Sequence, residues 1–109
     1  MTRKQFIAFP TIMKSTNEYI TLLRTFKAQH SQDYGIDEIG IFGSVARGEQ
    51  HEGSDVDVCV TMSRPNLFIL SGIKQDLETL FGCSVDVVRK HNHMSPIFLR
   101  NLERDCVYA

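Results

Sequence analysis

The sequence predicts a single small α/β domain, in which helices cover mainly one face of a mixed β-sheet. Short apolar segments typical of strands alternate with segments of helical periodicity along the chain, and such alternation is characteristic of α/β sheets. With 109 residues, 42% of them hydrophobic, the chain has the length and composition of one globular domain with one core. We therefore expect one domain over residues 1–109, with residues 1–14 as an N-terminal tail that is flexible or pairs with a sheet edge.

The first half of the chain predicts a helix, two strands and a short connecting helix. Ser15 and Glu18 form a capping-box pattern, which marks a helix start. Apolar residues at helical spacing follow it, and Gly35 lies beyond the helix end. A first strand is expected over residues 38–42 and a second over residues 55–62. Between these strands we expect a turn of small residues, a short helix and a polar loop.

The second half predicts two helices and two further strands. A long helix opens at residues 65–66, and Gly82 is placed to end it. The apolar positions of this helix form one stripe, which we assign to the core: Leu67, Leu70, Ile73, Leu77, Leu80 and Phe81. A third strand is expected over residues 84–88. A last helix is expected over residues 96–104, because proline is favoured at the first helical position, and residues 107–108 are expected to add a short edge strand.

The turn after the first strand and the start of the second strand carry the most informative residues. Gly43 and Ser44 form a small-residue turn that opens the short helix, and backbone N–H groups at such a turn can meet a phosphate. Because strand side chains alternate between faces, Asp55 and Asp57 point the same way. Adjacent carboxylates repel each other unless a cation lies between them, and Mg²⁺ binds carboxylates together with substrate phosphates. The pattern predicts a metal–nucleotide site.

The third strand supplies another carboxylate. Val85 and Val87 should face the core, so Asp86 should project to the face that Asp55 and Asp57 occupy. Taken alone, an acid such as Asp86 is more often a solvated strand residue. If the second and third strands are neighbours, however, three carboxylates converge on one sheet face.

The motif Gly-Ser-x-Ala-Arg-Gly over residues 43–48, followed by Ser-Asp-hydrophobic-Asp over residues 54–57, resembles a known family. It is similar to the minimal nucleotidyltransferases of the DNA polymerase beta-like nucleotidyltransferase superfamily. In that family the two motifs lie between apolar strands, as they do here, and an acidic residue on a following strand completes the metal site. Either motif alone would be weak evidence, but the pair at this spacing is specific, and the resemblance covers nearly the whole chain.

The resemblance implies roles for individual residues. Asp55, Asp57 and Asp86 would be catalytic and would hold two Mg²⁺ ions against the α-phosphate of a nucleoside triphosphate, most simply ATP. Asp86 could also accept the proton of the attacking hydroxyl. Nucleotide binding is assigned to residues of the turn and short helix: Gly43, Ser44, Arg47 and Gly48.

Two features have competing interpretations. Arg47 can reach triphosphate oxygens as a bidentate donor, or it can pair on the surface with Glu49 or Glu52. For Glu49 the sequence suggests no independent role. His91 and His93 resemble a pair of metal ligands, but two histidines without further Cys or His partners make a poor site. We expect them to lie in a loop.

Charge and composition bear on the function class. The formal net charge is −1, which argues against nonspecific nucleic-acid binding and so against a polymerase. No apolar run is long enough to cross a bilayer. The three cysteines, Cys59, Cys83 and Cys106, are widely spaced and odd in number, as is typical of reduced and mostly buried thiols. We therefore expect a cytoplasmic protein.

The chain has little sequence beyond the nucleotide-binding half of larger nucleotidyltransferases, so we expect a partner protein or a second copy to supply the acceptor. By resemblance, the partner would be a small helical HEPN-type RNase, and the pair would be a toxin–antitoxin system in which AMP passes from ATP to a tyrosine of the toxin. Two alternatives stay open. One is a module that neutralises its partner by binding alone. The other is a two-metal nuclease, which would leave Arg47 and the Gly-Ser turn without a purpose.

Overall fold

The computed structural model describes residues 14–109. Its elements are α1 (Thr16–Tyr34), β2 (Ile36–Phe42), α2 (Gly43–Ala46), β3 (Val56–Met62), α3 (Leu67–Phe81), β4 (Val85–Arg89), α4 (Pro96–Asp105) and β5 (Val107–Tyr108). This is the order that the sequence predicts, and the strand limits differ from the prediction by one or two residues. The predicted N-terminal tail, residues 1–14, lies outside the described residues except for Lys14.

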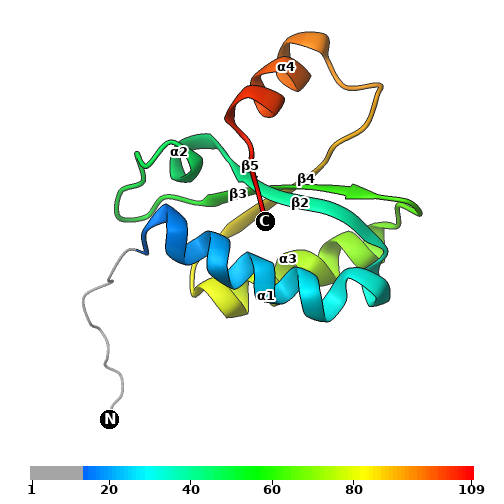
Figure 1. The fold of residues 1–109 in the computed structure, drawn as a ribbon, viewed down its shortest axis with the longest axis horizontal. Coiled ribbons are helices and arrows are strands. Elements are labelled where there is room, and N and C mark those ends of the chain that lie inside the picture. Colours follow the sequence, from blue (N-terminus) through cyan, green and yellow to red (C-terminus); the bar gives the residue numbers. More distant parts are fainter. Residues whose placement is uncertain (1–13) are drawn as a thin grey trace.

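The strands of the described chain form one mixed sheet in the order β4-β3-β2-β5. β2 runs antiparallel to both β3 and β5, whereas β3 and β4 are parallel. Figure 1 shows α1 and α3 together on one face of the sheet and α4 on the opposite face. The prediction of a mixed sheet covered mainly on one face is therefore confirmed.

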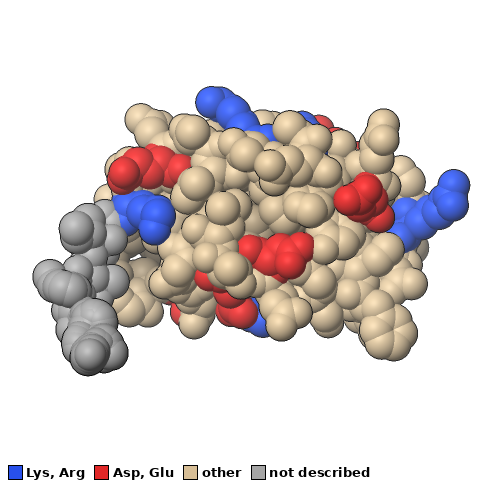
Figure 2. All heavy atoms as spheres, turned by 90° about the horizontal axis from the view of Figure 1, so that it is seen from below, with Lys and Arg blue, Asp and Glu red and all other residues tan. Residues whose placement is uncertain are grey.

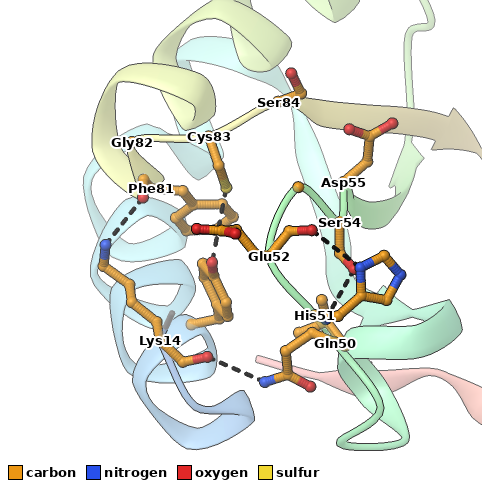
Figure 3. Close-up of a pocket in the computed structure, with 13 residues that line it drawn as sticks. Lys14, Gln50, His51, Glu52, Ser54, Asp55, Phe81, Gly82, Cys83 and Ser84 are labelled. Carbon is orange, nitrogen blue, oxygen red and sulfur yellow. Dashed lines mark hydrogen bonds between the residues drawn. The ribbon is translucent and has the colours of Figure 1, made fainter. Parts of the chain in front are cut away.

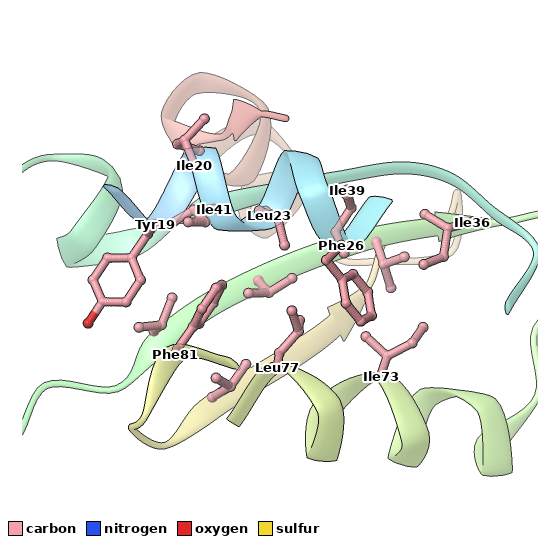
Figure 4. Packing of buried hydrophobic residues seen from close by; sticks show 14 of the residues in the cluster. Tyr19, Ile20, Leu23, Phe26, Ile36, Ile39, Ile41, Ile73, Leu77 and Phe81 are labelled. Carbon is pink, nitrogen blue, oxygen red and sulfur yellow. The ribbon is translucent and has the colours of Figure 1, made fainter. Parts of the chain in front are cut away.

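The core lies between the sheet and the pair α1 and α3 (Figure 4). Leu23 of α1, Ile39 of β2 and Leu77 of α3 have no exposed surface. The same holds for alternate residues of β3: Val56, Val58 and Val60. Each fully buried side chain of this size stabilises the fold by about 1.5–3 kcal/mol. Because alternate β3 residues are anchored in this core, the residues between them face the side of the sheet where α4 lies.

One core prediction is wrong in part. Ile73, Leu77 and Phe81 of α3 are buried as expected, but Leu67 is 81% exposed and Leu80 is 37% exposed. Leu67 opens the helix, after an N-cap at residue 66. Helical spacing indicates which face of a helix is apolar, but it does not indicate how far along the helix the sheet extends.

The outer face of the helical layer carries mixed charge. Figure 2 shows acidic and basic side chains scattered singly among uncharged residues on the face over α1 and α3. On the described surface in this view there is no continuous basic track of the kind that a polyanion needs. Within residues 14–109, no helix is both long and apolar enough to span a membrane.

Candidate active site

Two neighbouring parallel strands bring two of the predicted carboxylates together. Asp57 of β3 is directly opposite Asp86 of β4 in the strand register. Their neighbours Val56 and Val85 are also paired and are buried against α1 and α3. Since side chains alternate along each strand, burial of the valines directs both carboxylates to the other face of the sheet.

Asp55 lies in the extended segment just before β3 and is exposed. It is close enough to influence Asp57, whose pKa is raised chiefly by burial and then by the negative charges of Asp86 and Asp55. Arg47 acts in the opposite direction and lowers the pKa of Asp57. Two negatively charged side chains therefore lie near the half-buried carboxylate of Asp57, and this arrangement favours a bound cation.

Carboxylate oxygens are suitable ligands for Mg²⁺, which also retains water and takes phosphate oxygens from a substrate. The donor chemistry of Asp55, Asp57 and Asp86 thus fits the predicted metal. Among residues 14–109, however, no three His, Cys, Asp or Glu side chains are gathered closely enough to form a ready-made metal cage. The three-carboxylate metal site accordingly stays a prediction.

Gly43 packs directly against Asp57. Its φ is +73°, in the left-handed region, and a methyl group there would overlap the Oδ2 atom of Asp57 and lie 3.2 Å from its Cγ. Phe42, the residue before Gly43, pairs with Asp57 across β2 and β3. Glycine is therefore required at this position both by the backbone conformation and by the carboxylate beside it.

Backbone hydrogen bonds hold the rest of the turn. The carbonyl of Ser44 accepts a hydrogen bond from the N–H of Glu49 at 2.8 Å, and the N–H of Gly48 donates to the carbonyl of Val45 at 3.1 Å. Thr16, at the start of α1, donates through its hydroxyl to the same Val45 carbonyl at 2.5 Å. Ser44 and Gly48, both predicted to bind nucleotide, thus belong to one turn that α1 supports.

Arg47 is engaged in two ion pairs. Its Nε lies 2.9 Å from Oε1 of Glu49, and its Nη1 lies 3.1 Å from Oδ2 of Asp105. The alternative prediction, that Arg47 pairs with Glu49 on the surface, is therefore confirmed. This ion pair is the role that the structure gives to Glu49. Glu52, the other predicted partner, lines a cavity instead. Asp105 was not predicted at all, because it lies 58 residues away from Arg47 in the sequence.

A cavity of about 500 Å³ lies beside this cluster, between the start of α1, the loop before β3 and the turn after α3 (Figure 3). Asp55 is at its rim, and Lys14, Tyr19 and Cys83 are among the other residues that line it. The ammonium group of Lys14 donates to the carbonyl of Phe81 at 2.9 Å. Asp57 and Asp86 do not line the cavity. They lie on the sheet face opposite α1 and α3, where Asp57 is half-buried and Asp86 is exposed.

His91 and His93 lie in the loop between β4 and α4, as expected. Their ring centroids are 6.2 Å apart, and neither belongs to a group of three metal-ligating side chains within the described residues. The histidine pair is thus a loop feature outside the site.

Comparison with known proteins identifies the family. The family model described as nucleotidyltransferase domain matches residues 23–108. The protein adenylyltransferase MntA of Thermococcus cleftensis is 36% identical over 98 residues, which are 89% of this chain and 98% of that protein. A solved structure assigned as a minimal nucleotidyltransferase aligns with a TM-score of 0.71 and 28% identity over 86% of this chain and 95% of the other.

A more distant structure shares the fold. A chain from the complex of tri-AMPylated Shewanella oneidensis HEPN toxin with MNT antitoxin aligns with a TM-score of 0.53 at 20% identity, over 85% of this chain and 66% of that one. The class itself follows from the family match and from the MntA relative. The chain belongs to the nucleotidyltransferase domain family and is an enzyme of that type.

Proposed function

We propose that this enzyme transfers AMP from ATP onto a hydroxyl group of a partner protein, with Mg²⁺ as the cofactor and pyrophosphate as the second product. The observation that carries the proposal is the placement of Asp57 opposite Asp86, with Gly43 packed against the Asp57 carboxylate. This arrangement puts a candidate phosphate-binding turn next to candidate metal ligands. The similarity to protein adenylyltransferase MntA supports protein as the acceptor.

The three carboxylates would bind the metal ions and accept the proton of the attacking hydroxyl. Asp55, Asp57 and Asp86 would ligate two Mg²⁺ ions, and bound Mg²⁺ would lower the pKa of the attacking hydroxyl and neutralise the departing pyrophosphate. The hydroxyl oxygen attacks the α-phosphorus, and the bond from that phosphorus to the oxygen bridging to the β-phosphate breaks. Asp86, which is exposed, would take the proton of the hydroxyl.

The turn would bind the triphosphate. Gly43 lets phosphate oxygens approach the backbone closely, and Ser44 and Gly48 belong to the same turn. Arg47 is a bidentate donor that already lies close enough to lower the pKa of Asp57. To bind phosphate oxygens, Arg47 would exchange its contacts with Glu49 and Asp105 for the nucleotide.

For the partner we propose a small helical HEPN-type protein. The support is a structural neighbour in which an MNT antitoxin is bound to an AMPylated HEPN toxin. The proposal includes a cytoplasmic location, where ATP and Mg²⁺ are available, and assembly with the partner as a hetero-oligomer.

The test is a labelling experiment. The protein, Mg²⁺ and a lysate supplemented with a purified HEPN-type RNase are incubated with ATP labelled at either the α- or the γ-phosphate. We expect label on the HEPN protein from the α position alone, and loss of that label with Asp57→Asn. Asp37→Asn is the matched control, because Asp37 is an exposed strand carboxylate in β2 that contacts Ser63 instead of the site. Label on the HEPN protein that depends on Asp57 but comes from the γ position and not from the α position would refute nucleotidyl transfer.

The same variants separate catalysis from simple binding. If the chain only neutralises its partner by binding, Asp57→Asn should inhibit the RNase as fully as the wild-type protein does, in the absence as in the presence of ATP. If transfer is the function, inhibition should depend on ATP and should be lost with Asp57→Asn while that variant still binds the partner. Degradation of nucleic acid with Mg²⁺ alone, without a triphosphate, would instead support the nuclease alternative.

A further inference from the structure

Two of the three cysteines meet on the sheet face opposite α1 and α3. The Sγ atoms of Cys59 in β3 and Cys106, the residue between α4 and β5, are 2.9 Å apart, although 47 positions separate the residues in the sequence. A disulfide bond is about 2.05 Å long, so the two sulfurs need to approach by less than about 1 Å. We propose that Cys59 and Cys106 are a reversible dithiol–disulfide pair, whose oxidised form fastens the C-terminal segment to β3.

Gly40 of β2 explains how the thiol of Cys59 in β3 can meet the thiol of Cys106 next to β5, although β2 lies between the two strands. β2 lies between β3 and β5, and Gly40 pairs with Cys59 on one side and with Tyr108 on the other. A Cβ atom at Gly40 would lie 2.6 Å from the Sγ of Cys106. Any side chain at this position would therefore occupy the space in which the two thiols come together.

The environments of the two thiols differ in a way that suits stepwise oxidation. Contact with Cys59 lowers the pKa of Cys106, and Tyr108 and Lys90 act in the same direction. Cys59 is only 1% exposed, whereas Cys106 is half-buried. Cys106 is thus the more accessible thiol, and its pKa is lowered, so it is the first to react.

The oxidant in this proposal is a low-molecular-weight disulfide. The Cys106 thiolate attacks one sulfur of that disulfide, forms a mixed disulfide and releases one thiolate. Cys59 then gives up its proton and attacks the Cys106 sulfur, which breaks the mixed disulfide and releases the second small thiol. The two protein thiols are oxidised and one small disulfide is reduced to two thiols. Excess small thiol reverses both steps.

The location of the pair connects it with the candidate active site. Cys59 follows Asp57 by two positions on the same face of β3. Cys106 directly follows Asp105, whose carboxylate accepts a hydrogen bond from Arg47. The disulfide would therefore join the strand that carries Asp57 to the segment that holds Arg47 in its ion pair.

The test counts thiols in the full chain. The reduced protein is equilibrated with mixtures of reduced and oxidised glutathione, quenched in acid, unfolded and treated with a maleimide, and its intact mass is measured. We expect three labels on the reduced chain and one on the oxidised monomer, with no glutathione retained and a peptide map that links Cys59 to Cys106. The oxidised chain should also melt at least about 5 °C above the reduced one.

Variants assign the bond. Cys83→Ser is the matched control, since Cys83 packs against the core and contacts the hydroxyl of Tyr19 instead of the other two thiols. This variant should still lose two thiols on oxidation. Cys106→Ser should keep its remaining thiols free. Cys59→Ser lacks the thiol that resolves the mixed disulfide, so it should stop at a glutathione adduct on Cys106 and form no bond within the chain. In the wild-type chain, three labels at every glutathione ratio, a stable glutathione adduct on Cys106, or a bond that includes Cys83 would each overturn the proposal. The thiol count on the wild-type chain decides the matter even if a variant fails to fold.

Discussion

Replacing Gly43 with alanine should separate the stability of the turn from the position of the Asp57 carboxylate, which we propose to be catalytic. Alanine at this position must adopt a φ of +73°, and left-handed backbone costs a residue with a side chain about 1–2 kcal/mol. For a domain of this size, each kcal/mol lowers the melting temperature by about 4–8 °C. The new methyl group would also overlap Oδ2 of Asp57, with the Cγ of Asp57 at 3.2 Å.

The overlap determines the size of the activity loss. Ordinary contacts of a Cβ atom begin at 3.4 Å, so the Asp57 carboxylate has to shift or turn by roughly 1 Å, and a displacement of that size can reduce the rate by about 100-fold. We therefore expect Gly43→Ala to fold, to melt earlier than wild type, and to transfer AMP about 100-fold more slowly.

Gly35, the residue that follows the C-terminal end of α1, offers a matched control. Its φ is +66°, and a Cβ atom there would meet nothing within 4 Å. Gly35→Ala should therefore lose a similar amount of stability and keep its activity. Both variants are melted by differential scanning fluorimetry, and transfer of α-phosphate label is measured at a temperature where both are folded. Equal activities in the two variants would refute the idea that Gly43 is needed to make room for Asp57.

Three further predictions concern charge and packing. Because burial and the neighbouring carboxylates raise the pKa of Asp57 above its usual 3.8, the folded state loses stability as the pH rises through the interval between the unfolded and folded pKa values. Asp57→Asn should therefore have a higher melting temperature than wild type at pH 7, and this difference should vanish below pH 3.8. A lower melting temperature of the variant at pH 7 would contradict the conclusion that the ionised carboxylate destabilises the fold. Leu77→Ala should cost about 2–5 kcal/mol in urea unfolding, whereas Leu67→Ala, at an 81% exposed position, should cost less than about 0.5 kcal/mol. Asp105→Asn should free Arg47 and tighten MgATP binding by about twofold in calorimetry, and weaker binding would show that Asp105 positions Arg47 for the nucleotide.

Local sequence patterns were sufficient to predict the helices and strands, and the sheet face to which Asp57 and Asp86 point. The alternation of Asp57 with Val56 and Val58 indicates which side of β3 is buried, and the same reasoning applies to Asp86 beside Val85. Both inferences hold because side-chain direction in a strand has a period of two, whatever the strand pairs with.

Contacts between distant segments were not predictable in this way. The ion pair of Arg47 with Asp105 and the contact of Cys59 with Cys106 both depend on β5 pairing with β2 and on where α4 ends. A single sequence contains no local signal for strand order. The exposure of Leu67 has a similar origin, since it depends on where α3 sits against the sheet.

The alternation along β3 has a consequence for how this enzyme can change over time. Val56 and Val58 face the helices and have no exposed surface. Asp57, the residue between them, faces the opposite side of the sheet. Residues that maintain the fold and residues that we propose to meet substrate are therefore interleaved in one strand but lie on separate surfaces. A library that varies only the exposed residues of β3 and β4 on the face opposite α1 and α3 could explore new acceptors or nucleotides while the hydrophobic core stays unchanged. Natural divergence can follow the same route.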